Sequence, residues 1–366
     1  MLYRNYTALA PHLRKRLSLP TENPDRPFER VLLRRSDGVV DETVLTVLPP
    51  AGADAESPSD TATAALEAYI GKRGTPPAVF FLPGIGRLCV ERPAATAEKP
   101  LAGTIALVTG AAGAIGLGVS EHLLKSGACV ALTDLAGPAL DAAVAALRVG
   151  YGDAVIGAGL DVTDPASVAS GFDAATEAWG GVDLVVVNAG IAHVSPLMEM
   201  DLAVFQKLER VNIDGTLLVL AEAGRRLKEQ ALGGDIVLIS TKNVFAPGAK
   251  FGAYSATKAA AHQLARIASL EMADFGVRVN MVAPDAVFSH GDRKSGLWAA
   301  VGPDRMKARG LDEKGLEEYY RSRNLLKARV TAEHVARAVM FFATRQTPTT
   351  GATIPVDGGL PDATPR

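Results

Sequence analysis

Tyr254 stands four residues before Lys258 in the stretch "YSATK". In a helix, side chains four residues apart lie on the same face, so the phenol and the ammonium would be neighbours. A nearby cation favours the phenolate and lowers a pKa that is ordinarily about 10. Such a pair could exchange a proton with a substrate oxygen near neutral pH. The alternative is a surface tyrosine beside a surface lysine without a chemical role. Other features of the sequence are needed to choose between the catalytic and the structural interpretation.

A glycine-rich turn, "TGAAGAIG", occupies residues 109–116, between an apolar strand-like run and a helix-like run. Glycines at such a turn allow the backbone to approach a pyrophosphate, which the helix N-terminus then stabilises. The sequence therefore predicts a dinucleotide site whose phosphate-binding residues are Gly110, Gly113, Ala114, Ile115 and Gly116.

Asp134, followed by Leu135, closes the next strand-like run in "VALTDLAG". A carboxylate there can accept hydrogen bonds from the adenosine ribose hydroxyls and would repel a 2′-phosphate. Neither the glycine-rich turn nor the residues directly after Asp134 carry a Lys or Arg that would offset the repulsion. This pattern predicts NAD rather than NADP, the alternative being an aspartate that only caps the next helix.

From Thr104 onward, strand-like and helix-like segments alternate. The predicted strands are 104–110, 129–134, 154–162, 182–190, 235–240, 277–284 and 352–359, with helices that include 116–126, 165–179, 201–230 and 252–275. This alternation implies parallel strands joined by right-handed crossovers, and several strands are apolar throughout, as strands covered on both faces are. The predicted fold class is α/β, a Rossmann-like, doubly wound, seven-stranded parallel sheet with its ligand beyond the carboxyl ends of the strands.

Two segments do not follow the alternation of strands and helices. Residues 1–96 contain a helix-like start, strand-like runs at 30–35, 43–49 and 78–84, a loop at 49–64 and a helix at 65–73. They predict a small α+β N-terminal domain ahead of a dinucleotide-binding domain at 97–366. Residues 285–330 are charged and helix-prone, and an insertion at the carboxyl end of a strand commonly forms a lid over the substrate.

Composition excludes several classes of function. The 366 residues are 48% hydrophobic with a formal net charge of −2, which provides no basic field for nucleic acid. No apolar run is long enough to span a membrane, no targeting segment is visible, and the isolated Cys89 and Cys129 suit a reducing compartment. We expect a cytoplasmic protein that binds a small molecule, without a metal, a membrane or nucleic acid.

Over residues 101–360 the pattern resembles the short-chain dehydrogenase/reductase family. The turn at 109–116 is similar to the family's glycine motif, with Ala114 at the middle glycine position, and Tyr254 and Lys258 match its YxxxK pair. Other matching residues are Asp161 with Val162 on the adenine side, Asn188, Ala189 and Gly190 after the fourth strand, Asn212 in a helix, and the "VDGG" of the last strand.

The resemblance implies roles for these residues. Tyr254 would be the acid–base, Lys258 would bind the nicotinamide ribose and lower the Tyr254 pKa, and Asn212 would order a water in a proton relay. Thr241 stands where the family has its catalytic serine, directly after Ser240. Pro284 is followed by Asp285, where the family usually has glycine, and Ala286 and Val287 would also contact the cofactor.

A narrower resemblance is to the dehydrogenase half of bifunctional class II aldolase/short-chain dehydrogenase proteins of sugar catabolism. It implies an NAD-dependent oxidation or reduction of a sugar- or hydroxyaldehyde-derived molecule. His12 is the only histidine before residue 122, too few for the aldolase metal site, so residues 1–96 would be a structural remnant. Two alternatives remain, a tailoring dehydrogenase of a biosynthetic pathway and a scaffold that binds NAD without turnover.

Four further residues are candidates for contact with substrate, namely His193, Lys242, Asp285 and His290. Trp298 and the pair Tyr319–Tyr320 are expected to pack within the lid. The family pairs subunits through two long helices, which here correspond to 201–230 and 252–275, so the resemblance implies a homodimer or homotetramer.

Overall fold

The fold is known from a computed structural model, which describes residues 5–37, 44–47, 58–361 and 363. Its main sheet has seven parallel strands in the order β13-β10-β9-β8-β5-β6-β7. Their bounds are β5 Ile105–Thr109, β6 Cys129–Asp134, β7 Val155–Gly159, β8 Leu184–Val187, β9 Gly234–Ile239, β10 Val277–Pro284 and β13 Thr353–Val356. The predicted seven-stranded parallel sheet is confirmed.

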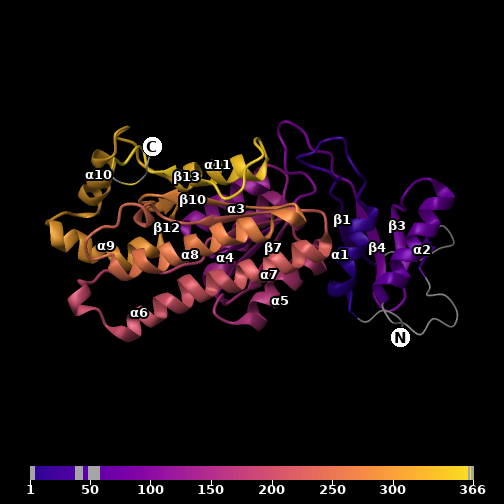
Figure 1. The fold of residues 1–366 in the computed structure, drawn as a ribbon, viewed down its shortest axis with the longest axis horizontal. Coiled ribbons are helices and arrows are strands. Elements are labelled where there is room, and N and C mark those ends of the chain that lie inside the picture. Colours follow the sequence, from indigo (N-terminus) through magenta and orange to yellow (C-terminus); the bar gives the residue numbers. More distant parts are fainter. Residues whose placement is uncertain (1–4, 38–43, 48–57, 362, 364–366) are drawn as a thin grey trace.

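Helices cover both faces of this sheet (Figure 1). On one face lie α3 Ala114–Lys125, α4 Pro138–Tyr151 and α11 Ala332–Ala343, and on the other α5 Pro165–Trp179, α7 Gly215–Gln230 and α8 Gly252–Glu271. Each face has its own cluster of buried Ala, Val, Leu and Ile side chains. Strands buried on both faces are apolar throughout, which explains why the sequence shows continuous rather than alternating runs.

Local signals fix where several helices begin. The Asp164 side chain accepts a hydrogen bond from the Ala166 N–H at 3.0 Å, and Pro165 occupies the first turn, so α5 begins at the predicted residue. The predicted helix at 201–230 is interrupted. It consists of α6 Leu202–Glu209 and α7, joined by a π-helical turn at Arg210–Asp214 that contains Asn212.

The strand order reverses between β5 and β8, which are neighbours in the sheet although β6, β7 and the helices α3, α4 and α5 lie between them in the chain. In open parallel sheets, ligands bind beyond the carboxyl ends of the strands at this reversal. The glycine-rich turn follows β5 and Asn188 follows β8, so the topology brings both to that point.

Residues ahead of the main sheet form a second, mixed sheet in the order β1-β4-β3-β2, with two helices. The elements are α1 Tyr6–Leu17, β1 Leu32–Ser36, β2 Leu45–Thr46, α2 Pro58–Arg73, β3 Val79–Leu82 and β4 Gly86–Glu91. They bury their own apolar cluster, which includes Leu13, Leu66, Phe80 and Leu88. We call these elements the N-terminal unit.

Two expectations for this unit need correction. The loop expected at 49–64 is helical from Pro58 onward, because a proline in the first turn of a helix loses no hydrogen bond; the part at 49–57 lies outside the described residues. A fourth strand, β4, was not predicted as a separate element. Gly84 and Gly86 have φ angles of 96° and 117°, which let the chain turn between β3 and β4.

The N-terminal unit packs against the amino ends of the main sheet through buried charges. Arg14 is fully buried and donates to the two carboxylate oxygens of Asp183 at 2.8 and 2.7 Å, and Arg30 pairs with the same carboxylate at 2.5 Å. Burial raises the pKa of Asp183, but Arg14 and Arg30 lower it to about 2. Asp183 stands directly before β8, so this cluster joins the two parts of the chain.

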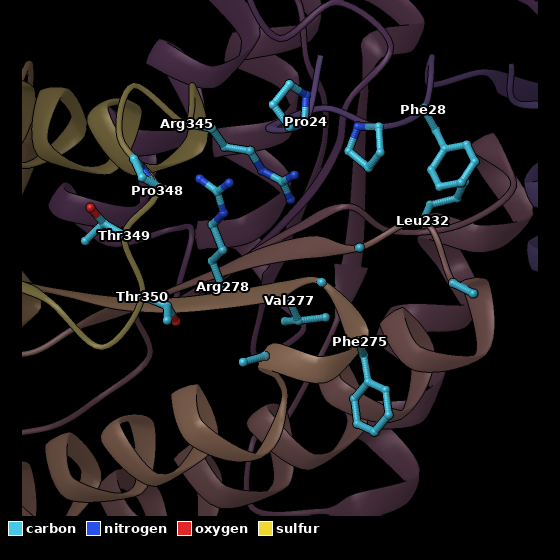
Figure 2. A pocket seen from close by; sticks show the side chains of 15 residues that line it. Pro24, Phe28, Leu232, Phe275, Val277, Arg278, Arg345, Pro348, Thr349 and Thr350 are labelled. Carbon is cyan, nitrogen blue, oxygen red and sulfur yellow. The ribbon is translucent and has the colours of Figure 1, made fainter. Parts of the chain in front are cut away.

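A cavity of about 400 Å³ lies at the same junction. Figure 2 shows the guanidinium groups of Arg278 and Arg345 close together in its wall. Arg278 donates to the Asp25 carboxylate and Arg345 to the Asp25 backbone carbonyl, each at 2.6 Å. Its other lining residues include Pro24, Phe28 and Val277, from the N-terminal unit and the start of β10. This cavity is at the opposite ends of the strands from the glycine-rich turn.

Residues 285–330 extend from the carboxyl ends of the strands. They form a short hairpin, β11 Ser289–His290 and β12 Arg293–Lys294, and two helices, α9 Gly296–Arg309 and α10 Glu313–Arg323, as their helix-prone sequence predicts. Figure 1 shows α9 and α10 at the opposite end of the molecule from the N-terminal unit. Within the described residues, no helix is both long and apolar enough to cross a membrane.

Candidate active site

A cavity of about 810 Å³ lies at the carboxyl ends of the strands. Its wall runs from the glycine-rich turn and the end of β6 to the start of α8 and the helices α9 and α10. Most predicted site residues line it, namely Gly110, Gly113, Ala114, Ile115, Asp134, Leu135, Asp161, Val162, Asn188, Ala189, Gly190, His193, Thr241, Lys242, Tyr254, Lys258, Pro284, Asp285, Ala286 and Val287. Gly116, Asn212 and His290 are the exceptions.

Tyr254 and Thr241 lie together in the cavity wall. Both side chains are buried, and the Thr241 hydroxyl lies near the Tyr254 phenol. Burial raises the pKa of Tyr254 to about 12, and the nearby Thr241 hydroxyl opposes that rise. Tyr254 is therefore a phenol, with its proton, in this arrangement.

Lys258 lies one turn further along α8, as the four-residue spacing predicts. Its Nζ donates to the Ile239 carbonyl at 2.8 Å, and burial lowers its pKa to about 8. The expectation that Lys258 lowers the Tyr254 pKa is not met in this structure. Burial of the phenol dominates, and the Lys258 ammonium is directed to a backbone carbonyl.

The adjacent hydroxyls at the end of β9 face different neighbours. The Ser240 Oγ lies 2.9 Å from His262 Nδ1 on α8, whereas Thr241 Oγ1 accepts from the Asn243 N–H at 3.3 Å and lies on the side of Tyr254. Successive side chains at a strand end point in opposite directions, so only one of the two can reach Tyr254 in this way. The geometry favours Thr241.

Asn212 is buried behind the cavity, in the π-helical turn. Its Oδ1 accepts from the Ile191 N–H at 2.9 Å, and its Nδ2 donates to the Ile191 carbonyl at 2.9 Å and to Thr257 Oγ1 at 3.0 Å. A Cβ added to Gly190 would lie 3.2 Å from Asn212 Oδ1 and 3.8 Å from Lys258 Nζ. Asn212 thus joins the loop after β8 to α8 close to Lys258, and π-helical turns are frequent at functional sites.

The glycine-rich turn suits a pyrophosphate. Gly110 has a φ of 64°, and a Cβ there would lie 2.9 Å from the Ala189 Cα. Gly116 does not line the cavity, and a Cβ there would meet the Gly110 carbonyl oxygen, so its role is to let α3 pack closely against the turn. Gly113 caps α3 without a side-chain hydrogen bond, which leaves N–H groups at the helix start to bind an anion.

Polar side chains hold the turn in place. Asn188 Nδ2 donates to the carbonyls of Thr109 and Gly110, at 2.9 and 3.0 Å. The Asp134 carboxylate accepts from the N–H groups of Ala112 and Leu135, at 3.0 and 2.8 Å, and it also lines the cavity. The residues therefore fit a dinucleotide, with carboxylate oxygens at the end of β6 and helix N–H groups at the start of α3.

The four substrate candidates have different positions. His193, Lys242 and Asp285 line the cavity, and Asp285 pairs with Arg323 at 2.5 Å. His290 does not line it. Its Nε2 lies 2.7 Å from the Glu121 carboxylate on α3, because the β11–β12 hairpin packs against that helix. The expectation for His290 is corrected accordingly.

Several lining residues were not predicted as site residues. Trp298 and Tyr320 pack within the lid segment, as expected, with ring centroids 4.9 Å apart, and they also line the cavity. Arg305 and Arg323 line it too, from α9 and α10. In the sequence both arginines belong to a charged helical stretch that is indistinguishable from a solvated face.

Comparison with known proteins places the chain in a family. Residues 104–299 match the family described as short chain dehydrogenase, and the chain belongs to that family. Membership means that it is an oxidoreductase acting on an alcohol or carbonyl, and it implies NAD or NADP as the cofactor.

Three similar proteins illustrate the range of the family. "Uncharacterized oxidoreductase YuxG" of Bacillus subtilis is 36% identical over 272 residues, 74% of this chain but only 39% of that protein. "(-)-Isopiperitenol/(-)-carveol dehydrogenase, mitochondrial" of Mentha piperita is 32% identical over 72% of this chain and 95% of its own length. The crystal structure of sorbitol-6-phosphate 2-dehydrogenase SrlD from Erwinia amylovora has a TM-score of 0.64 and 26% identity, over 70% of this chain and 98% of its own.

Proposed function

We propose that the protein is an NAD-dependent dehydrogenase/reductase that interconverts a hydroxyl and a carbonyl on a small polar molecule. The observation that carries the proposal is the placement of Tyr254 and Thr241, both buried, in the wall of the large cavity, with Lys258 one helical turn from Tyr254 on α8. This arrangement puts a phenol proton and a second hydroxyl where one substrate oxygen could contact both.

The roles of the residues follow from their contacts. Tyr254 would exchange its proton with the substrate oxygen, and Thr241 would hydrogen-bond that oxygen and orient it. Lys258, with a pKa of about 8, is mostly an ammonium at neutral pH and could donate to ribose hydroxyls. Asn212 would hold the loop after β8 beside it. A bound nicotinamide would supply or accept the hydride.

Charge distribution supports NAD over NADP. The lysines and arginines that line the cavity are Lys207, Lys242, Lys258, Arg305 and Arg323, and none comes from the elements around Asp134. A 2′-phosphate there would face the Asp134 carboxylate without a compensating cation. Charged side chains in the opposite part of the cavity favour a polar substrate over an apolar one such as the alcohol named for the Mentha piperita relative.

We also propose that residues 1–96 have a structural role. Among the described residues, none before Gly110 lines the large cavity, and the N-terminal unit packs at the other ends of the strands. Its one described histidine, His12, lies 3.4 Å from Glu229. The match to 39% of a longer relative agrees with descent from one part of a bifunctional protein.

Titration of both cofactors, followed by nicotinamide fluorescence, tests the proposal. NAD(H) should bind at least about tenfold more tightly than NADP(H), a difference of ~1.4 kcal/mol. Asp134→Ala should narrow that ratio. The enzyme with NAD⁺ should then oxidise at least one member of a panel of diols, polyols, hydroxyaldehydes and their phosphates. Equal affinity for NAD(H) and NADP(H) would show that Asp134 does not select against the 2′-phosphate.

A further inference from the structure

Three cationic side chains gather around the part of the cavity that holds Thr241 and Tyr254. Lys242 directly follows Thr241, Arg305 comes from α9 and Arg323 from the end of α10, and all three line the cavity. We call them the cation cluster.

Aromatic rings fix the two guanidinium groups. Arg305 lies over the Phe251 ring, 4.7 Å from its centroid, and the Phe251 and Tyr254 rings are 6.1 Å apart. Arg323 lies 4.1 Å over the Tyr320 ring, and Arg305 Nη2 donates to the Tyr320 hydroxyl at 3.2 Å. Both guanidinium groups are therefore held in place by packing, close to the Tyr254 end of the cavity.

The negative charge beside the cluster is too small to balance it. Asp285 pairs with Arg323 at 2.5 Å, whereas Arg305 and Lys242 have no carboxylate within ion-pair distance among the described residues. Lys242 Nζ donates to the Ala246 carbonyl at 3.0 Å. Three cations and one carboxylate leave a local excess of two positive charges.

Two guanidinium nitrogens in the cluster have no partner. Arg305 exposes 9% of its surface, and its Nε is buried without a hydrogen bond, as is the Nε of Arg323. Burial lowers the pKa of Lys242, and the neighbouring Arg323 and Arg305 lower it further while Asp285 raises it. Buried charges in proteins are normally paired, so a cluster with this surplus is suited to an anion that is not part of the chain.

We propose that the cation cluster is a subsite that binds a phosphate monoester carried by the substrate. A phosphate monoester bears close to two negative charges at neutral pH and offers three acceptor oxygens, which matches the surplus of charge and the planar forks of two arginines. The inference rests on the proposed function, because it places the phosphate beside the oxygen that Tyr254 and Thr241 would contact.

The cofactor's own phosphates have a separate place. The uncapped start of α3 and the glycine-rich turn offer backbone N–H groups to the pyrophosphate, whereas the cluster comes from the end of β9, α9 and α10. An enzyme saturated with NAD⁺ should therefore still bind an added anion at the cluster.

Calorimetric titration of the NAD⁺-saturated enzyme with inorganic phosphate tests this inference, with acetate as the second anion. Arg305→Met should weaken phosphate binding by about tenfold or more, since a hydrogen bond to a charged group is lost, and leave NAD⁺ affinity unchanged. Lys242→Gln should also weaken phosphate binding, and it replaces Arg305→Met as the test variant if Arg305→Met folds poorly. Arg309→Met is the matched control, because Arg309 is on α9 but stacks on Tyr319 outside the cavity lining.

The outcomes separate this inference from the proposed function. Phosphate binding that falls in Arg305→Met and not in Arg309→Met supports the subsite. Absence of phosphate binding, equal binding by both variants, tighter binding of acetate, or displacement of phosphate by NAD⁺ would each overturn it. If NAD⁺ binding and oxidation of an uncharged alcohol persist in that case, only the subsite is wrong; if they too are absent, the proposed function fails.

Discussion

Replacing Arg14 by methionine should loosen the N-terminal unit from the amino ends of the main sheet. Arg14 is completely buried, and its Nε donates to the Val31 carbonyl at 2.6 Å. Its two terminal nitrogens donate to Asp183, and Nη1 also donates to Gln230 at 3.2 Å. Methionine has a similar length, so the change removes charge and hydrogen bonds with little loss of volume.

The expected cost can be placed within known limits. Breaking a buried ion pair by removing one partner typically costs about 3–5 kcal/mol. Arg30 remains 2.5 Å from Asp183, and the Ile105 N–H still donates to it at 2.9 Å, so the carboxylate keeps partial compensation. We therefore expect a loss at the lower end, about 3 kcal/mol of unfolding free energy.

Urea unfolding followed by intrinsic fluorescence measures this loss. Arg16→Met is the matched control on the same helix, because the Arg16–Glu67 pair is about half exposed and such pairs contribute at most about 1 kcal/mol. The folded pKa of Asp183, about 2, is below its ordinary 3.8, so the pair stabilises the protein above pH 3.8 and less as the pH falls toward 2. The difference in unfolding free energy between wild type and Arg14→Met should therefore decrease as the pH falls from 3.8 toward 2. An Arg14→Met protein that unfolds like Arg16→Met would refute the role of this ion pair.

Three other results are expected. Thr241→Ala should lower turnover by about 100-fold, the order seen when a donor to a reacting oxygen is removed. Thr241→Ser and Ser240→Ala should remain active in steady-state kinetics. If Ser240→Ala loses activity and Thr241→Ala keeps it, Ser240 is the residue that contacts the substrate oxygen. Light scattering should detect at least a dimer, since a closed two-fold contact is the commonest assembly and α7 and α8 correspond to the family's pairing helices; a monomer at micromolar concentration would contradict this. Deletion of residues 1–96 should expose the apolar and charged surface around Asp183 and cause aggregation or a changed oligomer, and an unchanged, active oligomer would show that the segment is dispensable.

The main sheet was predictable because each strand carries its own signal. Runs such as 184–187 are apolar throughout and are followed by Asn188, and Asp164 with Pro165 marks the start of a helix. The second hairpin strand, Gly86–Glu91, was also within reach, since the glycines of "LPGIG" are a turn signal.

Contacts between distant residues were not predictable in the same way. Arg14 and Asp183 are 169 residues apart, and the sequence around either residue does not indicate that the two form an ion pair. The same holds for Arg305 and Arg323, which reach the cavity only because α9 and α10 fold back over the strand ends. His290 is close in sequence to Asp285, yet the hairpin carries it to Glu121. Strand alternation predicts that Ser240 and Thr241 point in opposite directions, but not which of the two faces Tyr254.

The most direct test of the proposed chemistry is the activity of Tyr254→Phe. The substitution removes one oxygen from a buried ring and keeps its packing, so NAD⁺ affinity and unfolding should change little. Turnover of the substrate found in the panel should fall by about 100-fold or more, as expected when a general acid–base is lost. A Phe variant that binds NAD⁺ normally and keeps near-full turnover would show that Tyr254 does not transfer the proton.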